Sequence, residues 1–523
     1  MNTTDISYLR SVRRWSLSQW IVLAATLLSA LLVAIAVERP SQWVDERIAL
    51  SLVDAPDPGS ALANVIAGER RPPAWHLLLW AWSQGAGDTE RSARLFSGLW
   101  AILLVPAVYQ LARAFTSRKG AAYAALFAAT APVVISYGQT VRYYGFVAAM
   151  AALSFAAFFR LMQGRGRPWL AYAVSTGLLL YSDYPAYGVP LAQGLIGLLL
   201  WRRRFSRPHD PRRRWLAILV GLGLPLLLWV PVVLLQGGRD FGQAELSGGV
   251  SGVILRLGYS AYAWLVGETL FPWSPLAIAG LLAGLLLAVL GLRALRPRTQ
   301  GAWWVAFGVP LLIAQILLAT VAVDAPFVNA PPRSMACFGL VCVLVGAGLA
   351  ALRRPVLLGA ALVAVLGAHG AGLLNYYRGE AFLNTVYNTP AREVARAVAA
   401  SAQPGDAIVG ESDSVVDVYL PPALRAGYFD LSDQAGLAAW LSDHPAATVW
   451  QIELGRDRTR NPAAELQRTA LLGDARQPRQ LVGQRGFGGQ DPLYRALKGR
   501  LLGREVYEYR LTVHQLSPLP VLK

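Results

Sequence analysis

The chain has 523 residues, of which 55% are hydrophobic and only 15% are charged, and its mean hydropathy is +0.40. This composition excludes an ordinary soluble protein, in which about a quarter of the residues are charged. The formal net charge of +17 comes largely from arginines in short loops between apolar runs, so it indicates membrane topology and gives no reason to expect a nucleic-acid partner. Cys337 and Cys342 fall in one apolar run and predict neither a disulfide framework nor a metal site.

The first apolar run, residues 15–37, is long enough to cross a bilayer. It lacks a small-residue cleavage site, so we expect a retained span and not a cleaved signal peptide. Arginines precede this run, which predicts a cytoplasmic N-terminus. Residues 38–92 then lie on the far side of the membrane. Within them, the run 74–83 is rich in Trp and Leu but too short to span, which predicts an interfacial helix.

Further apolar runs alternate with arginine-rich loops on the inner side and acidic loops on the outer side. This pattern predicts an α-helical polytopic membrane domain over residues 1–374, with about eleven transmembrane helices and a second large external loop at 237–273. The predicted spans after the first are 93–114, 120–136, 145–161, 168–182, 186–201, 215–236, 274–292, 302–322, 334–352 and 355–374.

The composition changes at residue 375, because charged residues become more frequent and no later run is long enough to span. Helix-like stretches at 391–401 and 432–443 alternate with strand-like stretches at 407–410, 447–452 and 506–511. Such alternation predicts a small α/β domain over residues 375–523, which the last span places outside the cytoplasm.

Polar residues that could carry chemistry gather in the predicted external loops. A single one is most simply a helix cap or a snorkelling side chain, but this set shares one side of the membrane and carries both signs of charge. Carboxylates can accept a proton from a hydroxyl or bind a divalent cation, and arginines can bind a phosphate. Beside a lipid-bordering helix, the set predicts a transferase that takes a group from a lipid phosphate. The residues are Asp45, Glu46, Arg47, Glu69, Arg70, Gln139, Arg142, Asp183 and Arg333.

The order of these motifs resembles that of the GT-C glycosyltransferases, in particular the branch of the protein O-mannosyltransferases and the lipid A aminoarabinose transferase. An acidic pair follows the first span, Glu-Arg-Arg-Pro-Pro at 69–73 precedes the aromatic helix, and Arg-Leu-Phe-Ser-Gly-Leu at 94–99 opens the second span. Residues 137–144 are similar to the family's Ser-Gln-Glu-Ala-Arg-Met-Tyr loop. Residues 180–184 are similar to its Tyr-Thr-His-Tyr segment, and 331–333 to its Pro-Arg-Tyr element. The resemblance implies a GT-C fold over most of residues 15–375.

The resemblance also implies roles for single residues. Asp45 matches the family's general base on the acceptor hydroxyl, and Glu46 accompanies it as a catalytic candidate. Glu69 matches a metal ligand of the aminoarabinose transferase, so a divalent metal ion is expected at Glu69 and Asp45. The arginines expected to bind the donor phosphate are Arg70, Arg142 and Arg333.

Two positions depart from the family pattern. Thr140 stands where the family loop has Glu, and Asp183 stands where many relatives have His. One interpretation is that Asp183 supplies the lost carboxylate. Gln139 and Asp183 are therefore retained as further site candidates.

The implied function is a hexosyl- or pentosyltransferase of the bacterial inner membrane. Its donor would be a polyprenyl-phosphate sugar, and its acceptor a glycan, a lipid such as lipid A, or a protein, in an inverting transfer outside the cytoplasm. A transporter or flippase for a lipid-linked or anionic solute is the alternative, but such proteins place functional charges near the midplane of repeated halves, and no repeat is evident. A scaffold for envelope assembly with an inactive membrane part is a third hypothesis.

Overall fold

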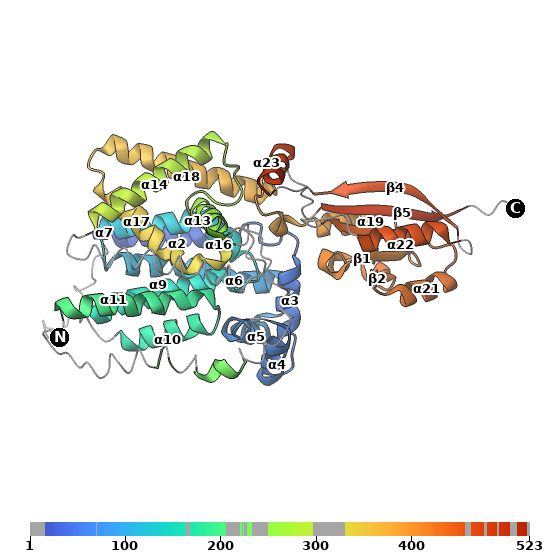
Figure 1. The fold of residues 1–523 in the computed structure, drawn as a ribbon, viewed down its shortest axis with the longest axis horizontal. Coiled ribbons are helices and arrows are strands. Elements are labelled where there is room, and N and C mark those ends of the chain that lie inside the picture. The colour runs from blue at the N-terminus through green and yellow to red at the C-terminus, as the bar shows by residue number, and fades with distance from the viewer. Residues whose placement is uncertain are drawn as a thin grey trace, which may run out of the picture.

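The computed structural model describes residues 16–69, 71–163, 168–204, 220–221, 223, 227–232, 249–295, 330–455, 462–474, 478–488, 491–502 and 510–519. They form a bundle of helices and a smaller part built on a β-sheet, which extends from one end of the bundle (Figure 1). The end of the bundle that carries the sheet is therefore where the two parts meet.

The helices of the bundle follow the predicted apolar runs. Five described helices are long and apolar enough to cross a membrane, and a sixth span is counted if the bent pair of α7 (Arg118–Thr130) and α8 (Pro132–Gly138), which meet at 53°, forms one. The five are α2 (Leu17–Ala34), α6 (Glu90–Ala112), α9 (Tyr144–Met162), α14 (Pro275–Ala294) and α18 (Pro355–Arg378).

Shorter helices complete the described bundle: α10 (Trp169–Leu180), α11 (Gly188–Arg204), α13 (Gly249–Leu265), α16 (Ala330–Arg333) and α17 (Phe338–Ala351). The external loop predicted at 237–273 is partly helical, because α13 occupies 17 of its residues. That helix is shorter than a span and contains Arg256, so its sequence did not stand out as one. The predicted span 302–322 lies outside the described residues and 215–236 lies mostly outside them, so the total of about eleven spans stays a prediction.

Glycines allow α17 to approach two neighbouring helices closely. A Cβ atom at Gly346 would lie 2.4 Å from the carbonyl oxygen of Gly120 on α7, and one at Gly348 would lie 2.0 Å from the carbonyl oxygen of Leu287 on α14. Small residues at helix contacts are typical of packing within membranes, where no hydrophobic effect drives helices together. These contacts fix the bundle that carries the external loops.

Three helices follow the first span at the end of the bundle nearest the sheet (Figure 1). They are α3 (Val44–Val53), α4 (Pro58–Gly68) and α5 (Ala74–Ala86). α5 matches the helix predicted at 74–83. α3 carries Asp45 and Glu46 in its first turn, where the partial positive charge of a helix N-terminus stabilises carboxylates. The acidic pair is thus held on a helix.

The smaller part contains one mixed five-stranded sheet in the order β2-β1-β3-β5-β4. β1 pairs in parallel with β2 and β3, whereas β5 runs antiparallel to β3 and β4. Its elements are α19 (Ala391–Ala399), β1 (Ala407–Gly410), α20 (Pro422–Arg425), β2 (Tyr428–Asp430), α21 (Gln434–Asp443), β3 (Val449–Gly455), α22 (Pro462–Gly473), β4 (Arg479–Phe487), α23 (Pro492–Leu502) and β5 (Arg510–Pro518). Each face of the sheet has its own apolar core, one including α19 and the other α21.

The helices and strands predicted at 391–401, 407–410, 432–443 and 447–452 correspond to α19, β1, α21 and β3. The strand predicted at 506–511 overlaps β5 only at its first two residues, and 503–509 lie outside the described residues. Two strands were not predicted, β2 and β4, and both lie at edges of the sheet.

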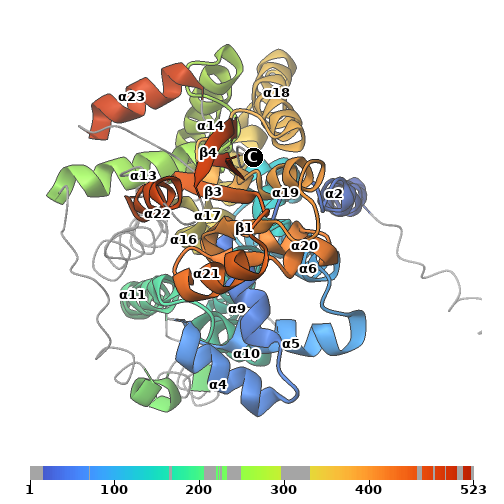
Figure 2. The same ribbon diagram turned by 90° about the vertical axis from the view of Figure 1, so that its right-hand side faces the viewer.

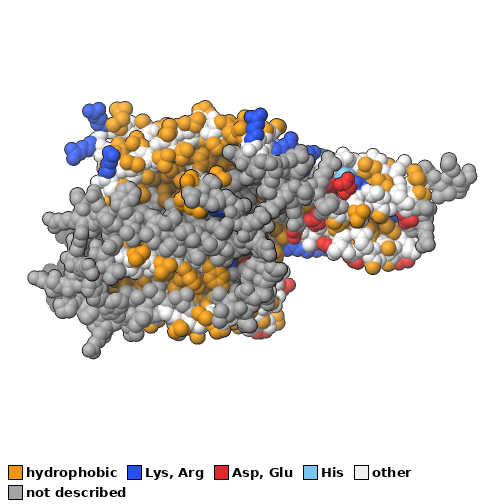
Figure 3. All heavy atoms as spheres, in the orientation of Figure 1, with side chains coloured by type: hydrophobic (Ala, Val, Ile, Leu, Met, Phe, Trp, Pro, Cys, Tyr) orange, Lys and Arg blue, Asp and Glu red, His pale blue; other side chains and the backbone are white. Residues whose placement is uncertain are grey.

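Charged side chains are distributed unevenly over the surface in Figure 3. Lys and Arg are seen at the end of the bundle farthest from the sheet and again near the junction, whereas Asp and Glu are seen at the junction and on the sheet part. Where side chains are coloured in Figure 3, the flank of the bundle between these ends is largely hydrophobic. This is the distribution expected if the far end faces the cytoplasm.

Candidate active site

Five charged side chains form one chain of alternating sign at the end of the bundle that carries the sheet. Arg142 Nη2 lies 3.2 Å from Asp45 Oδ2, and Arg142 Nη1 lies 3.3 Å from Glu69 Oε2. Arg71 Nε lies 3.8 Å from Glu69 Oε1, and Arg71 Nη1 lies 2.5 Å from Asp183 Oδ1. Residues from four separate segments thus meet, and we refer to Asp45, Arg142, Glu69, Arg71 and Asp183 as the charge chain.

The charge chain is open to solvent at one end only. Arg142 and Asp183 are 4% and 1% exposed, whereas the side chain of Asp45 is 31% exposed. The centroid of the Tyr143 ring lies 4.5 Å from the Arg71 guanidinium carbon and 5.5 Å from that of Arg142, so the ring contacts both cations through cation–π interactions. Asp45 is therefore the member that an incoming molecule can reach most easily.

Within the described part of the chain, several buried polar atoms beside the charge chain have no hydrogen-bond partner. They are Arg142 Nε, Tyr143 Oη, Asp183 Oδ2 and both ring nitrogens of His76, whose Nε2 lies 3.8 Å from Glu69 Oε2. Leaving a buried polar atom unpaired costs about 1–3 kcal/mol, so such atoms are rare unless a bound molecule satisfies them. The guanidinium, the phenol and the imidazole can each donate to an anion. The site thus offers spare donors where a phosphate could bind.

Burial shifts the pKa of the titratable groups in this loop cluster. Burial raises the pKa of Asp183 to about 7, an effect that the charge of Arg71 partly opposes. Burial lowers the pKa of His76 to about 4, partly opposed by Glu69, so the ring is neutral at pH 7. Burial disfavours the charged form of Arg142, but the carboxylates of Asp45 and Glu69 outweigh it and raise its pKa. Both arginines stay charged at any working pH.

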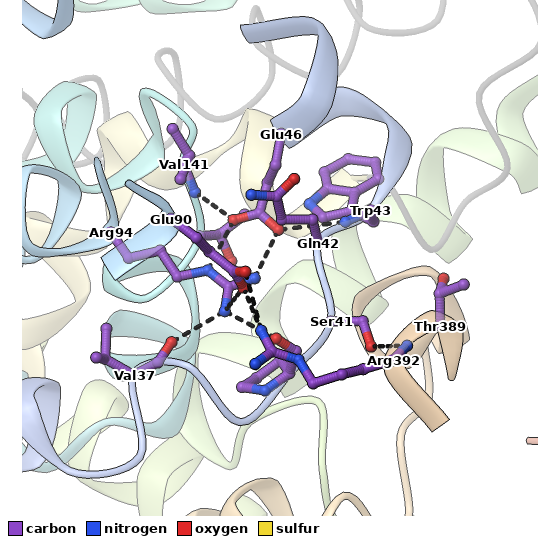
Figure 4. A network of polar contacts seen from close by, with 12 residues as sticks. Val37, Ser41, Gln42, Trp43, Glu46, Glu90, Arg94, Val141, Thr389 and Arg392 are labelled. Carbon is purple, nitrogen blue, oxygen red and sulfur yellow. Dashed lines mark hydrogen bonds and ion pairs between the residues drawn. The ribbon is translucent and has the colours of Figure 1, made fainter. Parts of the chain in front are cut away.

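Glu46 faces away from the charge chain and belongs to a second network, shown in Figure 4. Its oxygens accept hydrogen bonds from Arg94 Nε and Nη2 at 3.1 and 2.9 Å, from the Val141 backbone N–H at 2.8 Å and from the Trp43 N–H at 3.3 Å. The residue is 1% exposed. These four hydrogen bonds favour a positioning role for Glu46, and the catalytic role stays a prediction. Glu46 holds the first turn of α3 against the residue that precedes Arg142.

The Glu46 network continues into the sheet part through Glu90, the first residue of α6. Arg94 Nη1 lies 2.8 Å from Glu90 Oε1, and Arg392 of α19 donates to both Glu90 oxygens at 3.0 and 2.9 Å. Tyr419 Oη donates to Glu90 Oε2 at 3.1 Å. Figure 4 shows Glu90, Arg94 and Arg392 converging from the bundle and the sheet part. The sheet part is therefore tied to the helix that carries Asp45.

Arg47 adds a direct contact between α3 and the sheet part. Its Nη1 donates to Asp417 Oδ1 at 2.7 Å and to the Ser412 carbonyl oxygen at 3.1 Å. The sequence listed Arg47 among the possible site residues of the external loops. In the structure its side chain lies at the junction between the bundle and the sheet part.

The other predicted site residues lie apart from the charge chain or cannot be placed. Gln139 is 1% exposed and donates to the carbonyl oxygens of Val33 and Ile35 at 2.6 and 2.7 Å, so it ties the loop to the end of α2. Arg333 ends α16 half-buried, and among the described residues no ion pair or hydrogen bond joins it to the charge chain. Arg70 lies outside the described residues. Phosphate binding by Arg70 and Arg333 stays a prediction.

Sequence reasoning missed Arg71, Tyr143 and His76. Arg71 stands beside Arg70 in the same motif, and only the fold determines that its side chain enters the charge chain. His76 lies in the Trp-rich α5, where its neighbours suggested an interface and not a site. Tyr143 lies within the predicted 137–144 loop. A search of that loop for hydroxyls that could donate a hydrogen bond to a phosphate could have found it.

A second buried carboxyl group, Glu268, lies in the connection between α13 and α14. It accepts hydrogen bonds from Tyr259 Oη at 2.8 Å and from Tyr137 Oη. The ring of Tyr137 packs against that of Tyr387 at 5.7 Å, and Tyr387 packs against Trp43, beside the first turn of α3, at 5.2 Å. Burial raises the pKa of Glu268 to about 7, although the two tyrosine hydrogen bonds oppose this.

These shifts predict how stability changes with pH. The pKa values of Asp183 and Glu268 in the folded protein lie above their ordinary values of 3.8 and 4.5, so the folded state binds these protons more tightly than the unfolded chain. The resulting stability is fully present below about pH 4 and is lost as the pH rises through about 7. We expect the Tm of the purified protein to fall over this window. The D183N/E268Q variant should lose most of that slope, and an unchanged slope would contradict the assignment.

The two carboxylates of the predicted metal site, Glu69 and Asp45, both form ion pairs with an arginine. Each of these carboxylates lies within 3.3 Å of Arg142, and a guanidinium in that place competes with a cation. The described residues contain no group of three or more His, Cys, Asp or Glu that could hold a metal ion. In this arrangement the two carboxylates are paired with Arg142 and do not fit a metal ion.

Comparison with known proteins gives a family match over part of the chain and a similar fold. Residues 70–233 match the model of the family described as dolichyl-phosphate-mannose-protein mannosyltransferase. No curated protein sequence matches the chain. Among solved structures, ArnT from Cupriavidus metallidurans in the apo state is similar with a TM-score of 0.52 and 14% identity, over 96% of this chain and 98% of that one.

Two further structures are similar with lower scores. ArnT from Cupriavidus metallidurans bound to undecaprenyl phosphate has a TM-score of 0.48 at 14% identity, over 96% of this chain and 98% of that one. The Archaeoglobus fulgidus oligosaccharyltransferase in complex with Zn and sulfate has a TM-score of 0.45 at 11% identity, over 95% and 88%. The family match over residues 70–233 and the fold shared with apo ArnT both support the resemblance to GT-C glycosyltransferases that the loop motifs predicted.

Proposed function

We propose that the protein is a membrane glycosyltransferase that moves a sugar from a polyprenyl-phosphate donor to a hydroxyl of an acceptor outside the cytoplasm. The observation that supports this most is the charge chain, because it combines an accessible carboxylate with two arginines at one spot. The family match supports a lipid-phosphate donor, since that family is described by dolichyl-phosphate-mannose. The location we infer is a bacterial inner membrane with the sheet part outside, and the acidic side chains seen on the sheet part in Figure 3 support that orientation.

The proposed reaction is a single displacement at the sugar's anomeric carbon. Asp45 accepts the proton of the acceptor hydroxyl as the hydroxyl oxygen forms the new glycosidic bond. The bond between the anomeric carbon and the phosphate oxygen breaks, and polyprenyl phosphate leaves with that electron pair. Attack from the side opposite the leaving group inverts the anomeric configuration.

Arg142 and Arg71 stabilise the charge that develops on the departing phosphate. Their positions are set in advance by Asp45, Glu69 and Asp183, so little reorganisation is needed during the reaction. Both arginines are already in ion pairs, but each guanidinium has five N–H donors and Arg142 Nε has no partner. Tyr143 supplies an additional unpaired donor in the same place.

Sugar transfer from the polyprenyl-phosphate donor is expected to depend on Arg142. The R142Q variant keeps a polar side chain but loses the charge, and removing one pre-placed donor to a developing anion costs about 10²–10³-fold in kcat. The measurement is transfer of labelled sugar from a polyprenyl-phosphate donor by the purified protein in proteoliposomes. R354Q is the matched control, because Arg354 is an arginine just before α18, at the far end of that span from the junction. Donor movement across the bilayer without any glycosylated product would favour the transporter hypothesis and refute ours.

A further inference from the structure

Helix α23 belongs to the sheet part but lies against the helix bundle. In Figures 1 and 2 it lies away from the strands, on the side of the bundle that carries α14. Tyr494 is its buried anchor: its ring centroid lies 5.3 Å from that of Phe271 and 6.1 Å from that of Trp273, and its hydroxyl donates to the Leu383 carbonyl oxygen at 2.8 Å. The anchor fixes α23 to the bundle.

The aromatic residues that contact α23 indicate where it lies along the membrane normal. Phe271 and Trp273 stack at 4.8 Å and immediately precede α14, which begins at Pro275 and is apolar enough to span. Trp273 is 38% exposed. Tryptophans are enriched where a span meets the lipid headgroups, because the ring is apolar and its N–H is polar. α23 is thus attached at the outer boundary of the bilayer.

The free surface of α23 has the composition of an interfacial helix. Leu493 and Leu497 are 55% and 38% exposed and, four residues apart, share one face. Arg495 and Arg500 are exposed, and residues 492–502 contain no acidic residue. A basic helix with exposed leucines lies in a membrane interface with its leucines among the acyl chains and its cations at anionic headgroups.

We propose that α23 inserts into the outer interface of the membrane and binds anionic phospholipid headgroups, which anchors the sheet part to the bilayer. Lipid is the occupant that the surroundings favour, because Tyr494 holds α23 beside Phe271 and Trp273 at the start of α14, an apolar helix on which Leu276 is 46% exposed. The cations on the same helix complement anionic lipid. This anchoring is independent of the proposed glycosyl transfer.

The test uses the full-length protein in nanodiscs, with C337A and C342A removing the two natural thiols, which are buried. A bimane label is attached at L493C, and the discs contain lipids with a quenching nitroxide near the headgroup. L466C is the matched control, because Leu466 is a leucine of α22 that is 73% exposed on the sheet part. Each variant is compared in phosphatidylcholine discs and in discs containing phosphatidylglycerol.

We expect lipid quenchers to remove most of the fluorescence at L493C and to leave L466C unchanged. Quenching at L493C should be stronger in the anionic discs and should fall to the zwitterionic level when R495Q and R500Q are added. Equal quenching at the two positions, or none at L493C, would overturn the proposal. A label at L493C that is shielded from both lipid and aqueous quenchers would indicate a protein on this face and would also overturn it. Monodisperse elution and full labelling show that each variant is folded.

Discussion

Replacing Asp45 by Asn is expected to lower kcat for glycosyl transfer about 10²–10⁴-fold, the usual contribution of a general base. Asn has nearly the same shape and can still accept from Arg142, but it cannot take the proton of the acceptor hydroxyl. The KM for the donor should change little, since both arginines remain. Because the Asp45 side chain is 31% exposed, the Tm should also stay close to that of the natural protein.

The measurement for this variant is single-turnover transfer with saturating donor, alongside the Tm in the same detergent. D54N is the matched control, since Asp54 is an exposed carboxylate that ends the same helix. It should leave kcat unchanged. If the kcat of D45N were close to that of D54N, Asp45 would not be the general base.

The second large effect is expected from the Glu46–Arg94 pair, and it concerns stability. Both side chains are about 1% exposed: R94M leaves the Glu46 carboxylate buried without its arginine, and E46Q leaves the buried Arg94 with Glu90 as its remaining ion-pair partner. Such a change typically costs about 3–5 kcal/mol. We therefore expect E46Q and R94M each to lower the Tm strongly. Activity should fall as well, because Val141 and the first turn of α3 lose their common anchor.

The double variant E46Q/R94M distinguishes an ion pair from simple loss of packing. With both charges gone, it should be more stable than the sum of the two single losses predicts. R91Q is the control, because Arg91 is exposed on the same helix one turn away. If the Tm of E46Q were the same as that of R91Q, the ion pair of Glu46 with Arg94 would not stabilise the site.

Much of the bundle could be predicted because a bilayer imposes strong local rules. The length of an apolar run sets a span, as for α2, α9 and α18, and arginines at one end of each run set its direction. Helix α13 was not predicted from the sequence, because it is shorter than a typical membrane span and contains Arg256. In the sheet part, the central strands β1 and β3 are largely buried and rich in apolar residues, and both were predicted. The edge strands β2 and β4 were missed because an edge strand buries less surface and tolerates polar residues and glycine.

The site was predicted in outline and not in detail, for a related reason. Asp45, Glu69, Arg142 and Asp183 stand in loops at one predicted side of the membrane, so their sidedness followed from the span pattern. Which of two adjacent side chains enters the site depends on helix rotation and packing, which no local pattern encodes. Glu46 binds Arg94, 48 positions later in the chain, so its positioning role follows only from the fold.

The most direct test of the central claim is a structure of the full-length protein with polyprenyl phosphate bound in a nanodisc. The account predicts phosphate oxygens within hydrogen-bond distance of Arg142 and Arg71, with Asp45 facing the open side of the phosphate and the lipid chain lying along the bundle. A phosphate bound at the cytoplasmic end, or held away from both arginines, would contradict it.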